Sequence, residues 1–347
     1  MQTLWFILVA FMLTMYVLLD GFDLGAGIIH LIAARANIER REILRAIGPV
    51  WDGNEVWLIA AGGTLFFTFP VLYASSFSGF YLPLMMVLWL LVMRGVAIEL
   101  RSHIDNPVWR SLWDGAFFLG SALLAVFFGV AAGNVVRGVP LDAHYTFFEA
   151  LWTDFNPRSA NPGILDWYTI LIGLLAFSGL AMHGTNYIAV KTTGPVQDRA
   201  HRLFFPFWLA TAVLTALGTL ATFVIQPAMG AGYGARPWGW IFPLIAVGGF
   251  VATVYFHRQG RDLQALFSSG AYLAGMLASA AMGLYPRVLP AVNPAYSLTI
   301  QNASASQYGQ TVGLVWWIIG MILAAVYFIF IYRLFWGKIH VSETTGY

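Results

Sequence analysis

Apolar runs long enough to cross a lipid bilayer recur along the whole chain. A membrane-spanning helix needs about 20 apolar residues, and the sequence contains nine such stretches. Only 10% of the 347 residues are charged, and the mean hydropathy is +0.72, whereas a soluble domain carries roughly 25% charged residues. The expected spans are residues 4–32, 52–70, 78–100, 111–136, 164–190, 203–226, 238–256, 262–286 and 312–335. The sequence therefore predicts an all-α, multi-pass membrane protein.

Composition excludes several classes of function. The net charge of +2 is too small to indicate a nucleic-acid partner. The chain has no cysteine, which rules out disulfides, thiolate metal sites and thiol nucleophiles. The N-terminal segment MQTLWFILVAFML lacks the basic region and the small-residue cleavage site of a signal peptide. We therefore expect it to begin the first span.

The basic residues predict the orientation of the chain. Cytoplasmic loops of membrane proteins carry an excess of Lys and Arg. With the N-terminus outside, fourteen of the eighteen basic residues fall on the inner side or at inner helix ends. The other four are Arg137, Arg158, Arg236 and Arg287. Nine spans, an outer N-terminus and a cytoplasmic C-terminus are mutually consistent.

Two pairs of carboxylates lie within the first two spans. Asp20 and Asp23 occur in LLDGFDLGAG, and Asp52 and Glu55 occur in GPVWDGNEVWL. Each pair has i, i+3 spacing, so its members share a helix face. Two carboxylates in a low-dielectric environment cannot both ionise easily, which suits a group that holds and releases protons. Asn54 lies between the second pair and is expected to orient water.

Further ionisable residues occur at similar predicted depth. The third span carries Arg94 and Glu99, the fourth begins near Asp114, and the fifth contains His183. Of the seven acids in or beside spans, only Asp166 is expected at the outer end. A transporter that alternates access places its polar site near the midplane. The one-sided distribution instead predicts a polar route that leads inward from the cytoplasm.

Structural interpretations of the same residues remain open. Asp23, Arg94 and Asp114 are also compatible with a buried ion pair that docks helices, because a buried guanidinium needs a counterion. Asp52 and Glu55 are also compatible with acidic residues that complement a helix N-terminus. His183 is more typical of a helix-packing histidine than of a ligand. Gly21 and Gly25 form G-x-x-x-G, a motif of close helix packing.

No pattern in the chain predicts a redox centre of its own. A b-type haem between helices ordinarily has two axial ligands at matched depth, and His183 is the only histidine deep within a span. The chain also lacks a dinucleotide-binding glycine motif, a phosphate-binding loop and a zinc-protease motif. We therefore expect no cofactor and no metal on this chain.

Several motifs together resemble subunit II of cytochrome bd-type quinol oxidases. They are LLDGFDLGAG at 18–27, GPVWDGNEVWL at 48–58, AAGGTLFFTFPVLYASSFSGFY at 60–81, Arg94, WRSLWDGAFFLGS at 109–121, VAAGNVVRGVP at 130–140 and HGTNYIAVKT at 183–192. The first four spans match closely, and the second half matches mainly in the number and spacing of spans.

The resemblance implies a haem-free subunit of a respiratory oxidase in the cytoplasmic membrane of a bacterium or archaeon. Its partner, subunit I, would carry two b-type haems and one d-type haem, oxidise quinol and reduce oxygen to water. A small single-helix subunit and membrane lipid are further expected partners. The expected fold is two four-helix bundles, residues 1–137 and 164–287, plus a ninth helix at 311–336.

The resemblance also implies roles for individual residues. Asp52 would belong to a proton path from the cytoplasm, with Glu55, Asp20 and Asn54 as further candidates. Trp57 would lie near an oxygen-entry route. Asp23, Arg94, Asp114 and Glu99 would serve assembly or the haem environment, and His183 is a weak candidate haem ligand. None of these residues is expected to be catalytic by itself.

Two other classes of function compete with this interpretation. A proton-coupled secondary transporter would contain inverted repeats and broken helices that meet at midplane. The sequence WDG occurs at 51–53 and again at 113–115, which hints at a repeat but is too short to establish one. A purely structural scaffold would stabilise a partner and carry no protons.

Overall fold

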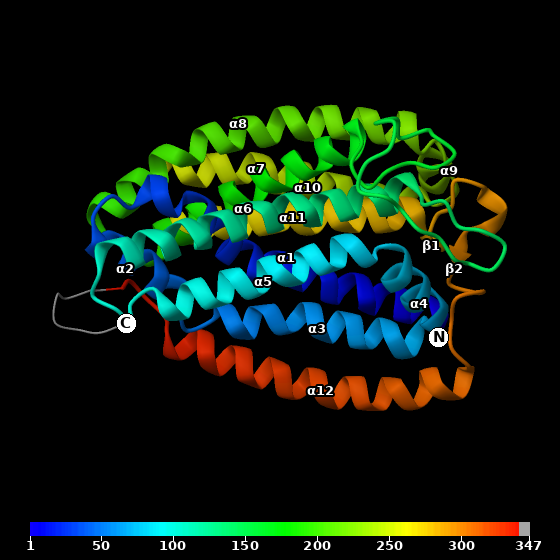
Figure 1. Ribbon diagram of the computed structural model, residues 1–347, viewed down its shortest axis with the longest axis horizontal. Helices are drawn as coiled ribbons and strands as arrows, with labels where there is room; N and C mark the ends of the chain where they lie inside the picture. The colour runs from blue at the N-terminus through cyan, green and yellow to red at the C-terminus, as the bar shows by residue number, and fades with distance from the viewer. Residues whose placement is uncertain (340–347) are drawn as a thin grey trace.

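The computed structural model describes residues 1–339 as a bundle of long helices that run along one common axis (Figure 1). The long helices are α1 (Gln2–Ala33), α3 (Trp51–Thr68), α5 (Tyr81–Leu100), α6 (Pro107–Arg137), α7 (Trp167–Lys191), α8 (Gly194–Ile225), α10 (Ile241–Arg258), α11 (Asp262–Leu284) and α12 (Gln307–Leu334). The shorter elements are α2 (Asn37–Ile47), α4 (Pro70–Gly79), α9 (Ala228–Ala235), the 3₁₀ turns η1 (Pro237–Trp240) and η2 (Pro294–Tyr296), and the strands β1 (Arg287–Leu289) and β2 (Leu298–Thr299).

Within residues 1–339, eight helices are long and apolar enough to cross a membrane. They are α1, α5, α6, α7, α8, α10 together with η1, α11 and α12. The remaining expected span, 52–70, coincides with α3, which has 18 residues. Asp52, Asn54 and Glu55 lie in the first turns of α3, and this helix is not among the eight. The structure thus supports eight of the nine predicted spans directly.

Helix α1 is the centre of the fold. It packs against α3, α6, α7 and α11, and α12 lies along α3 at the margin of the molecule (Figure 1). The closest approach to α7 occurs where Gly25 faces Gly184, because a Cβ atom on Gly184 would lie 2.5 Å from the Cα atom of Gly25. A side chain at either position would separate the two backbones. The G-x-x-x-G motif on α1 therefore lies in a close helix contact.

The two ends of the bundle differ in structure. Helix α2 and the last described residues lie at one end, and α4, β1 and β2 lie at the other (Figure 1). Neither α2 nor the antiparallel β1–β2 pair is predicted by the hydropathy pattern. Both are short and partly polar, so they escape a search for long apolar runs. The 138–166 loop covers the same end as the β1–β2 pair.

Candidate functional site

A buried guanidinium joins three helices in the core of the first half of the chain. Arg94 on α5 is fully buried, and its Nη2 atom lies 2.7 Å from Oδ1 of Asp20 on α1 and 2.8 Å from Oε1 of Glu55 on α3. The side chain of Asp20 is fully buried, whereas that of Glu55 is 20% exposed. One cation is therefore shared by two carboxylates, of which one reaches the surface.

A second chain of hydrogen bonds lies next to this ion cluster. Tyr332 on α12 donates to Oδ1 of Asn54 at 2.9 Å, and the amide nitrogen of Asn54 donates to Oδ2 of Asp23 at 2.7 Å. Asn54 and Asp23 are buried. The bond from Tyr332 fixes the amide of Asn54 with its nitrogen toward Asp23. Through Asn54, helix α12 is connected to the carboxylate of Asp23 on α1, a connection that the sequence did not predict.

Several buried polar atoms beside these residues have no hydrogen-bond partner among residues 1–339. They are the hydroxyl of Tyr16, Oδ2 of Asp20, Oδ1 of Asp23, Nε1 of Trp57, and Nε and Nη1 of Arg94. Buried polar groups of this kind are ordinarily satisfied by ordered water. These residues therefore form a polar region inside the helix bundle.

Asp52 and Trp57 lie at different depths on α3. Asp52 is exposed in the first turn of the helix. Trp57 is 7% exposed and packs against Phe11 and Phe328, with ring centroids 6.1 Å and 5.6 Å away. The predicted proton-path residues Asp52, Asn54, Glu55 and Asp20 thus run from the surface of α3 to the buried face of α1.

The counterions of Arg94 differ from those expected. Asp23 and Asp114 are the counterions that the sequence predicts for Arg94, but its partners in the structure are Asp20 and Glu55. Asp114 is instead bound by two other guanidinium groups and an imidazole. Its Oδ1 atom lies 2.5 Å from Nε of Arg101 and 2.7 Å from Nε2 of His30, and its Oδ2 atom lies 2.7 Å from Nη1 of Arg40. Depth along the membrane normal does not specify which helix faces which, so it could not select the partners.

Arg101 was the partner of Asp114 that a sequence signal could have identified. It is the C-cap residue of α5, seven residues after Arg94, and its backbone is still helical, so both side chains fall on the same helix face two turns apart. Both are buried. His30 and Arg40 come from α1 and α2, and no spacing in the sequence connects them to Asp114. Glu99, a further assembly candidate, is exposed on α5.

His183 occupies a packed contact between helices. Its Nε2 atom lies 3.0 Å from the carbonyl oxygen of Leu18, and its Nδ1 atom lies 2.7 Å from the hydroxyl of Ser269. A carbonyl only accepts, so Nε2 carries the proton, while the one hydroxyl proton of Ser269 is shared between Nδ1 and the carbonyl oxygen of Leu266, 2.8 Å away. Both ring nitrogens are therefore engaged, and this arrangement does not fit an axial haem ligand. It supports the helix-packing interpretation of His183.

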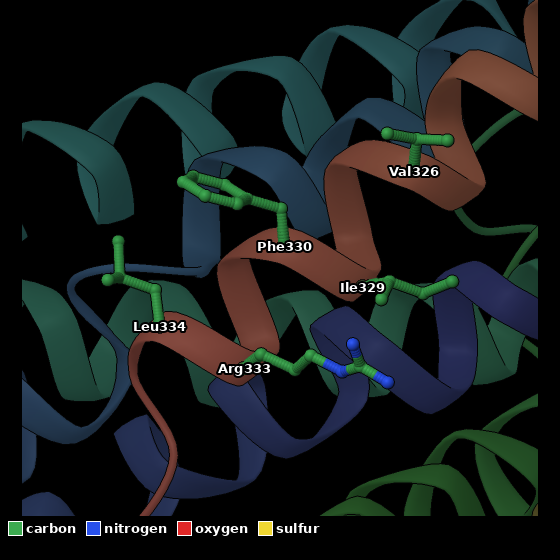
Figure 2. A pocket seen from close by; sticks show the side chains of 5 residues that line it. All are labelled: Val326, Ile329, Phe330, Arg333 and Leu334. Atoms are coloured by element: carbon green, nitrogen blue, oxygen red, sulfur yellow. The ribbon is translucent and has the colours of Figure 1, made fainter.

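A shallow groove on α12 is separate from the buried network. Figure 2 shows the five side chains that line it, which are Val326, Ile329, Phe330, Arg333 and Leu334. All of them come from α12, and Arg333 is the only polar one. The groove holds none of the carboxylates described above.

Nearly the whole chain matches one known protein family. Residues 1–335 match the family described as cytochrome bd terminal oxidase subunit II. The chain belongs to this family. Because the match covers nearly the whole sequence, the protein is a multi-pass membrane protein of a respiratory terminal oxidase. This result confirms the resemblance drawn from the sequence motifs and decides against the transporter alternative.

Individual relatives span almost the same length. The chain is 32% identical to a probable cytochrome oxidase subunit 2 of Haemophilus influenzae, over 99% of this chain and 96% of the relative. It is 32% identical to the cytochrome bd ubiquinol oxidase subunit 2 of Bacillus subtilis, over 89% and 88%. It is 30% identical to the cytochrome bd-I ubiquinol oxidase subunit 2 of Escherichia coli K12, over 90% and 86%.

A solved structure has the same fold. The structure of bd oxidase from Geobacillus thermodenitrificans contains a chain that superposes with a TM-score of 0.76. The match covers 96% of this chain and 98% of that chain, at 18% sequence identity. At this identity the likeness establishes the fold alone. The fold of that chain is thus shared although most side chains differ.

Proposed function

We propose that this chain is the haem-free subunit II of a quinol oxidase complex, that it stabilises a haem-bearing subunit I, and that it supplies a proton path from the cytoplasm. The names of the relatives from B. subtilis and E. coli suggest ubiquinol as the electron donor. Two b-type haems and one d-type haem are expected on subunit I. They would supply the electron transfer and oxygen chemistry of the complex.

The observation that carries the proton-path proposal is the Asp20–Arg94–Glu55 cluster. Ionisable groups within a bilayer are costly and are usually functional. Glu55 is partly exposed and Asp20 is fully buried, while one guanidinium contacts both. Asp52, exposed one turn before Glu55, is positioned to collect protons at the entrance. The positive charge of Arg94 would stabilise the ionised form of Asp20 or Glu55 as protons pass along the path.

The membrane topology belongs to the same proposal. We infer that α3 is the ninth span, because it packs between α1 and α12 although Asp52 and Glu55 reduce its hydropathy. An odd number of spans then places the N-terminus outside and the C-terminus in the cytoplasm, as the basic residues favour. The first bundle would contain α1, α3, α5 and α6, the second α7, α8, α10 and α11, and α12 would be the additional helix.

Replacement of Asp52 by Asn tests this proposal against the scaffold alternative. The substitution removes the charge at the entrance but keeps the size of an exposed side chain. We expect normal haem content in the purified complex and slower quinol-driven oxygen uptake. The matched control is Asp105→Asn, which makes the same change at a carboxylate whose side chain is 89% exposed in the same half of the chain. Full turnover in D52N would remove Asp52 from the path.

A further inference from the structure

A second buried ion cluster lies at the end of the bundle that carries β1 and β2. Arg137, the last residue of α6, is 6% exposed, and Glu149 and Asp166 are 1% and 0% exposed. Nη2 of Arg137 donates to Oε1 of Glu149 at 2.7 Å, and Nη1 donates to Oδ2 of Asp166. The guanidinium also donates to Oδ1 of Asn134 at 2.7 Å and to the carbonyl of Gly163 at 2.9 Å. The function proposed above uses none of these residues.

The surroundings stabilise a negative charge on Asp166 more than on Glu149. Asp166 is the N-cap of α7, and its Oδ1 atom accepts hydrogen bonds from the amides of Tyr168 and Thr169 at 2.8 Å and 2.9 Å. Capping bonds and the helix dipole both stabilise a negative charge at this position. Asp166 is therefore the carboxylate that balances the charge of Arg137.

Few groups stabilise a negative charge on Glu149. Its Oε2 atom is buried and has no hydrogen-bond partner among residues 1–339. Burial raises the pKa of Glu149 to about 8, although Arg137 opposes the rise and Asp166 adds to it. Arg137 and Asp166 are the charged groups that act on it. Helix α4, which contacts the loop, has no acidic or basic side chain.

Glu149 lies in the middle of a long loop that is held at several points. The 138–166 loop is bonded to the β1 region through Val139, whose amide donates to the carbonyl of Pro290 at 3.0 Å. It is bonded to α4 through the carbonyl of Tyr145, which accepts from Ser75 at 2.6 Å. Only the pair with Arg137 connects the side chain of Glu149 to the end of α6. The exposed aromatic residues Phe148 and Trp152 flank this point.

We propose that Glu149 is a protonation latch, in which its neutral acid form holds the 138–166 loop against the end of the bundle and loss of the proton loosens that loop. The geometry carries this proposal, because a second anion next to a guanidinium already neutralised by Asp166 has no further cation to balance it. A neutral acid keeps the hydrogen bond from Arg137 without that cost.

The opening equilibrium of the loop depends on pH because the pKa of Glu149 differs between the closed and the open loop. The pKa of Glu149 is raised in the closed loop and returns toward about 4.3 when the side chain is exposed. The closed form is therefore most stable below about pH 4.3 and loses stability as pH rises toward about 8. Between pH 6 and pH 8 the opening equilibrium should increase up to about 50-fold.

Hydrogen exchange of the complete purified oxidase complex, measured by mass spectrometry between pH 6 and pH 8, tests the latch. After correction for base-catalysed exchange, peptides from 145–160 should lose protection as pH rises, whereas peptides from 294–306 should not. Glu149→Gln, which stays neutral and nearly keeps the shape of the acid, should abolish the dependence. His144→Gln is the control that removes the exposed imidazole of the same loop and should retain it.

Two results would overturn the latch. One is a wild-type loop whose corrected protection is constant from pH 6 to pH 8, and this measurement remains decisive even if E149Q fails to assemble. The other is an unchanged pH dependence in E149Q. If H144Q rather than E149Q abolishes the dependence, the switch belongs to the imidazole and the assignment to Glu149 is wrong.

Discussion

Arg94 and Asp20 form a buried ion pair between α5 and α1, with 2.7 Å between Nη2 and Oδ1 and side chains that are 1% and 0% exposed. The pair connects α1 with α5, a helix that packs mainly against α6. Because Glu55 approaches the same nitrogen, the three helices α1, α3 and α5 depend on one guanidinium. The consequences of this arrangement can be measured.

Replacement of Arg94 by Gln should impair assembly of the complex. Removing one member of a buried ion pair leaves an uncompensated charge and typically costs about 3–5 kcal/mol. We expect a strongly reduced yield of intact, haem-loaded complex after purification. Arg110→Gln is the control, because Arg110 pairs with Asp105, whose side chain is 89% exposed, and exposed pairs contribute little. Equal yields from the two variants would contradict the structural role of Arg94.

Replacement of Tyr332 by Phe should destabilise the contact between α12 and the rest of the protein. The change removes the hydrogen bond from Tyr332 to Asn54 and leaves the amide oxygen of a buried residue without a partner. A loss of about 1–3 kcal/mol is expected, measured as a lower thermal unfolding temperature of the complex. Tyr308→Phe removes a hydroxyl from a residue that is 80% exposed and should leave that temperature unchanged.

Replacement of Gly184 by Ala should separate α1 from α7. A Cβ atom at this position would lie 2.2 Å from the carbonyl carbon of Gly25, so the backbones must move apart. Overpacking of this kind costs about 1–3 kcal/mol or more, and a lower unfolding temperature is expected. Gly248→Ala on α10 places its Cβ atom where no heavy atom lies within 4 Å. A comparable loss in G248A would show that glycine itself, not the close contact, is responsible.

The attachment of α2 should depend on pH through Glu39. Burial would raise the pKa of Glu39, but hydrogen bonds from Arg199 and from the amides of Ala36 and Arg35 outweigh it and lower the pKa to about 2. A lowered pKa means that the stabilisation is complete above about pH 4.3 and is lost as pH falls toward about 2. Wild type should therefore be more stable than Glu39→Gln at pH 6, and the difference in unfolding temperature should shrink by pH 3. A difference that is constant or grows toward pH 3 would exclude Glu39 as the cause.

Much of the fold could be predicted from the sequence because spanning helices are set by local composition. Each helix must satisfy its own backbone hydrogen bonds in lipid, so a long apolar run is sufficient evidence for α1, α6 or α12. The motif pairs around Asp20 and Asp52 were specific enough to indicate the family. The short elements α2 and β1–β2 lack both signals and were found only in the structure.

The sequence by itself determined that the chain spans a membrane, that its ionisable residues gather in a few helices, and which family it resembles. Only the tertiary structure decided the partners of the buried charges. Arg94 contacts Asp20 and Glu55. Asp114 contacts Arg101, His30 and Arg40, and Glu149 contacts Arg137. The physical reason is that helix periodicity gives the face on which a residue lies but not the helix that this face meets. An ion pair needs contact within a few ångströms, and only the packing of α1 against its neighbours sets which charges come that close.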